Sequence, residues 1–269
     1  MVFANENPNA PLKERGHVMF MHSNTVDVRY AEFHELGRTD KSQPLDNFKV
    51  NGSGFILKDS DGNSIPADPD TVDNRRGRYS FHFHRTGTET DSQPAIAKGN
   101  AVWGSPGLGY VHHESHARFE DNAAYNTFGA AFVTESGNET GAWINNIAIK
   151  SQGTGLAKEV VRFTHDVGVP GVGFWFQGRI VQNSGNVAAN HREAGFIYVL
   201  RGILRENPSA DTIDLPQILK GATDIGPDIP NIKGFANNEA FGSKMGLAVV
   251  KENPLQSHDV RSVLDGFKA

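Results

Sequence analysis

The stretch GRYSFHFHR, residues 77–85, carries two histidines, His82 and His84, that are two positions apart. In a β-strand alternate side chains face opposite sides, so both imidazoles would lie on one outer face, about 7 Å apart, with Tyr79 and the two phenylalanines turned inward. Neighbouring imidazoles can act as general acid or base, or bind a divalent metal ion. The alternative interpretation is a sheet face with two solvent-exposed histidines.

A second pair, His112 and His113, occurs in GYVHHES. A 22-residue repeat, described below, places His112 beside Thr134 and His113 beside Glu135 on the next coil, and stacked coils lie about 4.8 Å apart. A histidine, a glutamate and the FHFH pair would then converge on one groove, within reach for general acid and base catalysis. Two imidazoles and a carboxylate are also a common ligand set for Zn and other divalent ions, although no helical H-x-x-x-H spacing accompanies them.

Two acidic residues, Glu135 and Glu139, flank a glycine turn in FVTESGNETG. Glycoside hydrolysis uses such a pair of carboxylates, one as proton donor and the other as nucleophile or base. The alternative is a corner turn with two solvated acids.

Arginines surround the histidine pair in an otherwise acidic chain: Arg75, Arg76, Arg78 and Arg85. Guanidinium groups form bidentate contacts with carboxylates, so Arg78 and Arg85 are candidates for binding an acidic sugar polymer. His112 and the ring of Trp175 are further candidate substrate contacts. The alternative is that these arginines only offset the Asp-rich loop that precedes them.

That loop, KDSDGNSIPADPD, resembles a calcium-binding loop in the spacing of its oxygen ligands. Ser64 replaces the required glycine and Asp70 replaces the bidentate glutamate, so we expect a solvated turn. The possible cofactor is therefore a divalent ion, Zn or Ca, with His82 and His84 as the candidate ligands. A further histidine, His191, falls in a corner turn and is expected to be exposed.

The elements that must position these residues follow a repeat. Three pairs of similar residues are each 22 apart without a gap: Asn100 and Asn122, Gly107 and Gly129, Tyr110 and Phe132. The same frame returns from Asn145, Gly185 and Asn237. A parallel β-helix needs this pattern, because apolar residues stack inside its coils while Asn tolerates left-handed backbone at the corners and hydrogen-bonds to the next coil. We predict an all-β fold, a single-stranded right-handed parallel β-helix (solenoid) with inserted loops; the alternative is a β-sandwich.

We expect one elongated domain over residues 1–269, with insertions at about 38–76, 154–173 and 202–233, where the period breaks. Insertions of this kind often shape the binding face of a solenoid. Two short helices are expected, at 159–165 and 213–221.

Composition excludes several classes of protein. The chain has no cysteine, which rules out disulfides, thiolate metal sites and cysteine nucleophiles, and its net charge of -5 argues against nucleic acid as a partner. No run of 18 apolar residues occurs, so we predict no membrane insertion, and the first residues lack the features of a signal peptide. The polar start leads straight into HVMFMH, as expected of an excerpt from a longer protein.

The order of these motifs resembles the β-helical region of the cell-surface hyaluronidase and cell-migration-inducing hyaluronan-binding protein family and its bacterial relatives. RGHVMFMHS, GRYSFHFHR, GYVHHES and NAAYNTFGAAFVTESGNE follow one another over residues 15–150, and the later coils carry GFWFQG. Under this resemblance, five residues match positions of the family pattern: His82, His84, Glu135, Gly137 and Glu139. The chain departs from the family pattern at three positions: Ser80 stands in place of Pro, Ala130 of His and Ser136 of Asp.

The resemblance implies a protein that acts on, or binds, an acidic polysaccharide such as hyaluronan, at the cell surface or outside the cell. We predict a glycoside hydrolase in which Glu135 or Glu139 protonates the leaving oxygen, and His82, His84 or His113 acts as base or holds a metal. One alternative is a polysaccharide lyase, which would use a His, Tyr or Arg base. Another is a non-catalytic glycan-binding or structural module of a larger surface protein. The oligomeric state is not predicted.

Overall fold

The computed structural model describes residues 1–7, 9–23, 25–43, 45–51, 56–87, 93–154, 168–199, 232–250 and 261–269. Within these residues every pair of named strands is parallel, which excludes the antiparallel β-sandwich. The predicted helices at 159–165 and 213–221 lie outside the described residues, as does most of the insertion at 202–233.

The strands form two sheets. One is seven-stranded, in the order β1 (Val2–Ala4), β4 (Glu32–His34), β7 (Ala101–Trp103), β9 (Ala123–Tyr125), β12 (Ile147–Ile149), β15 (Val187–Ala189) and β18 (Glu239–Phe241). The other has 13 strands in two arms that share the long strand β8 (Tyr110–Glu120).

The first arm of the larger sheet runs β2 (Met19–Met21), β5 (Phe81–Gly87), β8, β10 (Phe132–Thr134), β13 (Val172–Phe176), β16 (Ala194–Val199), β19 (Met245–Val250). The second runs β3 (Asp27–Arg29), β6 (Ala95–Lys98), β8, β11 (Thr140–Ile144), β14 (Gln182–Ser184), β17 (Phe235–Ala236), β20 (Leu264–Asp265).

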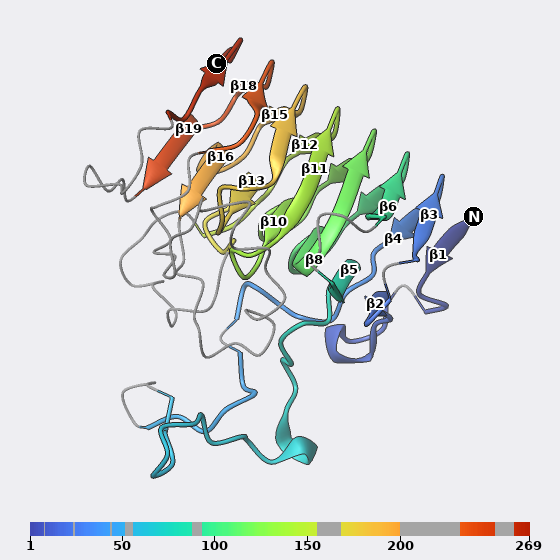
Figure 1. Cartoon of the computed structure of the whole chain (residues 1–269). Helices are drawn as coiled ribbons and strands as arrows, with labels where there is room; N and C mark the ends of the chain where they lie inside the picture. The colour runs from blue at the N-terminus through green and yellow to red at the C-terminus, as the bar shows by residue number, and fades with distance from the viewer. Residues whose placement is uncertain are drawn as a thin grey trace.

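The chain visits the first arm, the second arm and the seven-stranded sheet in turn, so each circuit adds a strand to each face (Figure 1). This winding agrees with a parallel β-helix, and its right-handedness stays a prediction.

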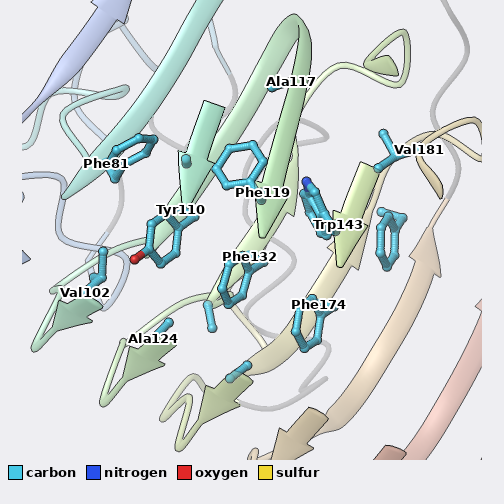
Figure 2. Packing of buried hydrophobic residues seen from close by; sticks show 14 of the residues in the cluster. Phe81, Val102, Tyr110, Ala117, Phe119, Ala124, Phe132, Trp143, Phe174 and Val181 are labelled. Carbon is cyan, nitrogen blue, oxygen red and sulfur yellow. The ribbon is translucent and has the colours of Figure 1, made fainter. Parts of the chain in front are cut away.

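Aromatic side chains stack from coil to coil in the interior. The ring centroids of Tyr110 and Phe132 lie 4.7 Å apart, those of Phe132 and Phe174 4.8 Å, and those of Phe174 and Phe196 4.8 Å. Figure 2 shows the first three of these rings along neighbouring strands. Each fully buried ring stabilises the stack by roughly 1.5–3 kcal/mol, because its apolar surface leaves water.

The predicted asparagine ladder is confirmed at one corner. The Nδ2 atom of each residue donates to the Oδ1 atom of the next, over 3.1, 2.9, 2.9 and 3.2 Å, through Asn100, Asn122, Asn146, Asn186 and Asn238. The asparagines that directly precede two of these, Asn145 and Asn237, have positive φ angles of 52° and 53°. Asparagine tolerates this left-handed backbone better than most residues, as the repeat predicted.

The Asp-rich segment projects away from the sheets (Figure 1). It folds back on itself at an exposed turn, in which the Oδ1 atom of Asp59 accepts the backbone N–H groups of Asp61 and Asn63 over 3.0 and 2.8 Å. This carboxylate is therefore bound to its own turn, in line with a solvated turn.

Candidate functional site

Three neighbouring strands, β5, β8 and β10, bring the candidate histidines and Glu135 together. In the parallel register His84 lies beside His113, and Thr134 lies beside His112. The backbone N–H of Glu135 continues this register by donating to the carbonyl of His112 over 3.0 Å. The placement that the 22-residue repeat predicted for His112 and His113 is thus confirmed.

The three imidazoles of His82, His84 and His113 form one cluster, the histidine cluster. The ring centroids of His82 and His84 lie 5.1 Å apart, those of His82 and His113 5.7 Å, and those of His84 and His113 4.6 Å. His82 is buried, whereas the side chain of His113 is 18% exposed and His84 is half-buried. The interpretation of two freely solvated histidines is therefore wrong for His82. Within the described part of the chain, the exposed surface of the cluster belongs to His84 and His113.

Glu135 is the acidic partner of the histidine cluster, and its carboxylate is buried. Its Oε2 atom lies 3.1 Å from Nδ1 of His113 and 3.9 Å from Nε2 of His82. Its Oε1 atom accepts a hydrogen bond from Tyr79 Oη over 3.2 Å and one from Arg76 Nη2 over 3.3 Å. One oxygen thus faces the imidazoles while the other is fixed by two donors.

The role of Tyr79 was missed in the sequence, where it was predicted to point inward. The strand β5 begins only at Phe81, so the alternation of side chains does not extend back to Tyr79. Phe81 and Phe83 do lie in the interior, but Tyr79 packs on the outer side with Val111 and Val133. The expected direction of Tyr79 is therefore wrong.

Burial and ion pairing shift the pKa values of the three clustered histidines in opposite directions. Burial lowers the pKa of His82 to about 3 and that of His84 to about 4, so both rings are neutral at neutral pH. Burial also opposes protonation of His113, but the carboxylates of Glu114 and Glu135 outweigh it and raise the pKa of His113 to about 9. For Glu135, burial is outweighed by His113 and Arg76, which hold the carboxyl pKa well below its usual range. At neutral pH His113 is thus the positive member of the pair, and the buried Glu135 is the negative one.

Glu114 is a second site residue that the sequence did not single out, although it directly follows the HH pair. Its buried carboxylate accepts from Arg85 Nε over 2.8 Å and lies 3.6 Å from Nε2 of His113. Arg85 and Glu114 both have left-handed backbone, with φ angles of 55° and 47°, where the register between β5 and β8 shifts. Left-handed backbone recurs at other corners of this fold, as at Asp121 and Lys150, so these two φ angles mark a corner of the coil.

Glu139 is buried, and its carboxylate braces the turn that follows Glu135. It accepts the backbone N–H groups of Ser136, Gly137 and Glu114 over 2.6, 2.7 and 3.2 Å. Burial raises the carboxyl pKa of Glu139 despite these donors. The alternative of two solvated acids is wrong, because both glutamates are buried.

A group of basic side chains lies next to the segment that leads into β5. Burial, Arg38 and Arg75 lower the pKa of Arg78, and burial, Arg38 and Arg78 lower the pKa of His17 to about 4. These basic groups are close enough to repel one another, which makes the surface favourable for an anion. Arg85 instead pairs with Glu114, although its side chain remains 45% exposed.

His112 and Trp175, the other candidate substrate contacts, offer no open surface in this structure. The ring of His112 is fully buried between Phe119 and Trp143, at centroid distances of 5.4 and 6.2 Å. Trp175 is 7% exposed and belongs to the same outer apolar cluster as Val133. Burial therefore argues against a substrate contact for either side chain.

His191 was expected to be exposed, and this expectation is wrong. The ring is 2% exposed; its Nδ1 accepts from the backbone N–H of Ser151, and its Nε2 donates to the carbonyl of Ala148, both over 3.1 Å. The imidazole bridges neighbouring coils at a corner, as the asparagines do elsewhere.

The fold and the site define a parallel β-helical protein with a buried acid and base cluster on its outer wall. Residues 73–247, more than half of the chain, match the family described as CEMIP beta-helix, so the chain belongs to this family. The resemblance noted in the motifs is thereby confirmed, and the matched segment includes the whole histidine cluster. Comparisons with curated proteins and with solved structures gave no match. Across the described ranges, no helix is long and apolar enough to cross a membrane.

Proposed function

We propose that this chain degrades an acidic polysaccharide such as hyaluronan, as a glycoside hydrolase, at the solvent-facing side of His84 and His113. The observation that carries the proposal is the ion pair of His113 and the buried Glu135, with Nδ1 and Oε2 only 3.1 Å apart. Glycosidic hydrolysis needs an electropositive or proton-donating group at the leaving oxygen and a base for water. In the proposed reaction His113 donates its proton to the leaving oxygen, and the neutral ring of His84, whose centroid lies 4.6 Å from that of His113, accepts the proton of the attacking water.

Within the pair, His113 is the member that reaches solvent, and Glu135 holds it in place. The Oε1 atom of Glu135 is already bound by Tyr79 and Arg76. We therefore assign substrate contact to His84 and His113, and to Glu135 the role of their ionised partner. Glu139 braces the turn between β10 and β11 and acts on the site through the backbone of Glu114.

The basic groups beside the cluster support an acidic polysaccharide as the substrate class. Arg78 with its neighbours Arg38 and Arg75, and the exposed part of Arg85, would bind the carboxylates that recur along an acidic glycan. Family membership supports hyaluronan as the first polymer to test, and it supports a place at the cell surface or outside the cell.

The test is digestion of hyaluronan and alginate by the purified protein, followed by separation of the products by size and by ultraviolet absorbance for unsaturated ends. Shorter chains without new absorbance are expected. His113→Asn and Glu135→Gln should each lower the turnover rate by about 100-fold or more, since each removes one member of the pair. His22→Asn, at an exposed position on the neighbouring strand end, should leave turnover unchanged.

Other outcomes separate the alternatives. Shorter chains with new ultraviolet absorbance would identify a polysaccharide lyase. Glycan that is bound but stays at full length, with equal affinity in His113→Asn, would identify a non-catalytic module. If no acidic glycan is bound or shortened, the proposed function is wrong.

A further inference from the structure

We propose that His82, His84 and His113 bind a divalent transition-metal ion of the zinc type, with Glu135 as the carboxylate beside it. The FHFH pair alone suggested two ligands, and the structure adds the third imidazole from the neighbouring strand. One ring nitrogen from each of the three histidines lies within 4.8 Å of those of the other two. The proposal does not depend on the function proposed above, because three imidazoles can bind an ion whatever the protein acts on.

The first argument is that each of the three rings has a buried nitrogen without a hydrogen-bond partner. These atoms are Nε2 of His82, Nδ1 of His84 and Nδ1 of His113. Nδ1 of His113 lies 3.1 Å from Glu135, but the two atoms are not aligned for a hydrogen bond. Buried polar atoms are nearly always satisfied, so three unsatisfied nitrogens in one cluster need an explanation. A single cation bound by all three would satisfy them.

The second argument concerns the opposite nitrogens of the same rings. Nδ1 of His82 lies 3.3 Å from the carbonyl oxygen of Gly77, which can only accept, so Nδ1 carries the proton and Nε2 presents its lone pair. Nε2 of His113 lies 3.6 Å from the carboxylate of Glu114. Histidines that bind metals usually donate their other ring N–H to a carbonyl or carboxylate, which fixes the tautomer and the ring orientation.

The donor atoms select the kind of ion. Three imidazole nitrogens, with Glu135 Oε2 next to two of them, suit Zn, Co, Ni or Cu, whereas Ca and Mg prefer a shell of oxygens. Zinc–nitrogen bonds of about 2.0–2.1 Å place tetrahedral ligand atoms roughly 3.4 Å apart. Small side-chain rotations would therefore close the cluster around an ion. Of the two ions considered from the sequence, the geometry favours zinc over calcium.

The ion would replace the proton of His113 as the positive member of the site. It would supply Lewis acidity to a bound oxygen, while Glu135 remains the negative member. The histidine cluster would then use His113 as a ligand, and the half-buried His84 would mark the side from which the ion and a substrate enter.

The experiment is a titration of the chelator-treated protein with Zn²⁺ and Co²⁺, in the absence of glycan. We expect one ion per chain by calorimetry, visible absorption from four-coordinate Co²⁺, and no displacement by excess Ca²⁺ or Mg²⁺. His84→Asn and His113→Asn should each weaken binding by about 100-fold or more, while His22→Asn should bind as the wild type does.

Folding is checked separately, by the circular dichroism and melting of each variant without metal. His84→Asn is the decisive variant, because its half-buried ring can be replaced with little loss of packing. Absence of one-to-one binding in the wild type would overturn the proposal, and so would binding that persists in folded His84→Asn and His113→Asn. The digestion assay is not part of this test, so failure of the proposed function and failure of the metal site remain distinguishable.

Discussion

The phenolic oxygen of Tyr79 lies 3.2 Å from Oε1 of Glu135, although the two residues are 56 positions apart in the chain. The contact joins the segment before β5 to the end of β10, across the strand β8 that lies between them. Together with Arg76, Tyr79 keeps one carboxylate oxygen engaged and leaves the other facing the histidine cluster. Tyr79 is therefore a positioning residue for Glu135.

Tyr79→Phe tests this role, because it retains the buried ring and removes only the donor. A hydrogen bond to a charged group contributes about 1.5–3 kcal/mol, so in the proposed hydrolysis the turnover rate should fall by roughly 10- to 100-fold with KM little changed. Steady-state kinetics on size-defined hyaluronan measures both constants. The matched control is Tyr125→Phe, on the seven-stranded sheet, which should retain full turnover. Equal rates in both variants would show that Tyr79 does not act on Glu135.

The asparagine ladder predicts a stability effect. Oδ1 of Asn146 accepts both the backbone N–H and the side-chain Nδ2 of Asn122, over 3.0 and 2.9 Å. Asn146→Ala leaves the backbone N–H of Asn122 without this partner, while Nδ2 of Asn122 keeps only its bond to the carbonyl of Ala97, so the free energy of unfolding, measured by urea denaturation, should fall by about 2–4 kcal/mol. Asn145→Gly is the control, because Asn145 is exposed and glycine accepts its positive φ angle of 52°. A smaller loss in Asn146→Ala than in this control would contradict the ladder's role.

The buried imidazole of His191 should make the stability of the protein depend on pH. Burial lowers its pKa from 6.5 to about 4, so between these values the unfolded chain binds a proton that the folded chain does not. Stability should therefore fall as the pH drops from about 6.5 to 4, with His191 contributing about 3 kcal/mol of the loss.

The comparison is between wild type and His191→Asn, by chemical denaturation at pH 7 and pH 5. The variant should be less stable at pH 7, where the two hydrogen bonds of the ring are lost, and the difference should narrow at pH 5. His22→Asn, which replaces an exposed ring, should follow the wild type. A difference that stays constant or widens would contradict a buried neutral imidazole.

Two glycines with positive φ angles allow the cost of backbone strain to be measured apart from the cost of a steric clash. Gly141 has a φ angle of 107°, and a Cβ atom there would lie 2.0 Å from the carbonyl oxygen of Ala117 on β8. Gly62 has a φ angle of 83° but has nothing within 4 Å of a Cβ atom. Gly62→Ala should thus cost about 1 kcal/mol from backbone strain alone, whereas Gly141→Ala should cost more than about 3 kcal/mol or prevent folding. Thermal melting of the two variants measures the contrast, and equal melting temperatures would contradict it.

The repeat made much of this structure predictable. Asn100 and Asn122 hydrogen-bond to each other as their spacing required, and His113 lies beside Glu135, because parallel strands in register carry a sequence period directly into space. The inward position of Phe81 and Phe83 also followed from strand alternation.

The roles of Tyr79, Glu114 and Glu139 could not be predicted, because they depend on backbone conformation that the 22-residue repeat does not describe. Tyr79 precedes its strand, so alternation could not give its direction, and Glu114 turns at a corner where left-handed backbone redirects the side chain. The bracing role of Glu139 arises from backbone N–H groups of the turn, which no pattern of side chains reports.

The strand β8 has a further consequence for how relatives of this chain can vary. Three consecutive circuits supply the histidine cluster and Glu135, through β5, β8 and β10. A slip of β8 by a single residue would turn His113 into the interior and His112 out to the solvent. Insertions inside these three strands should therefore be rare during evolution, whereas whole circuits can be gained or lost beyond β13 without touching the chemistry.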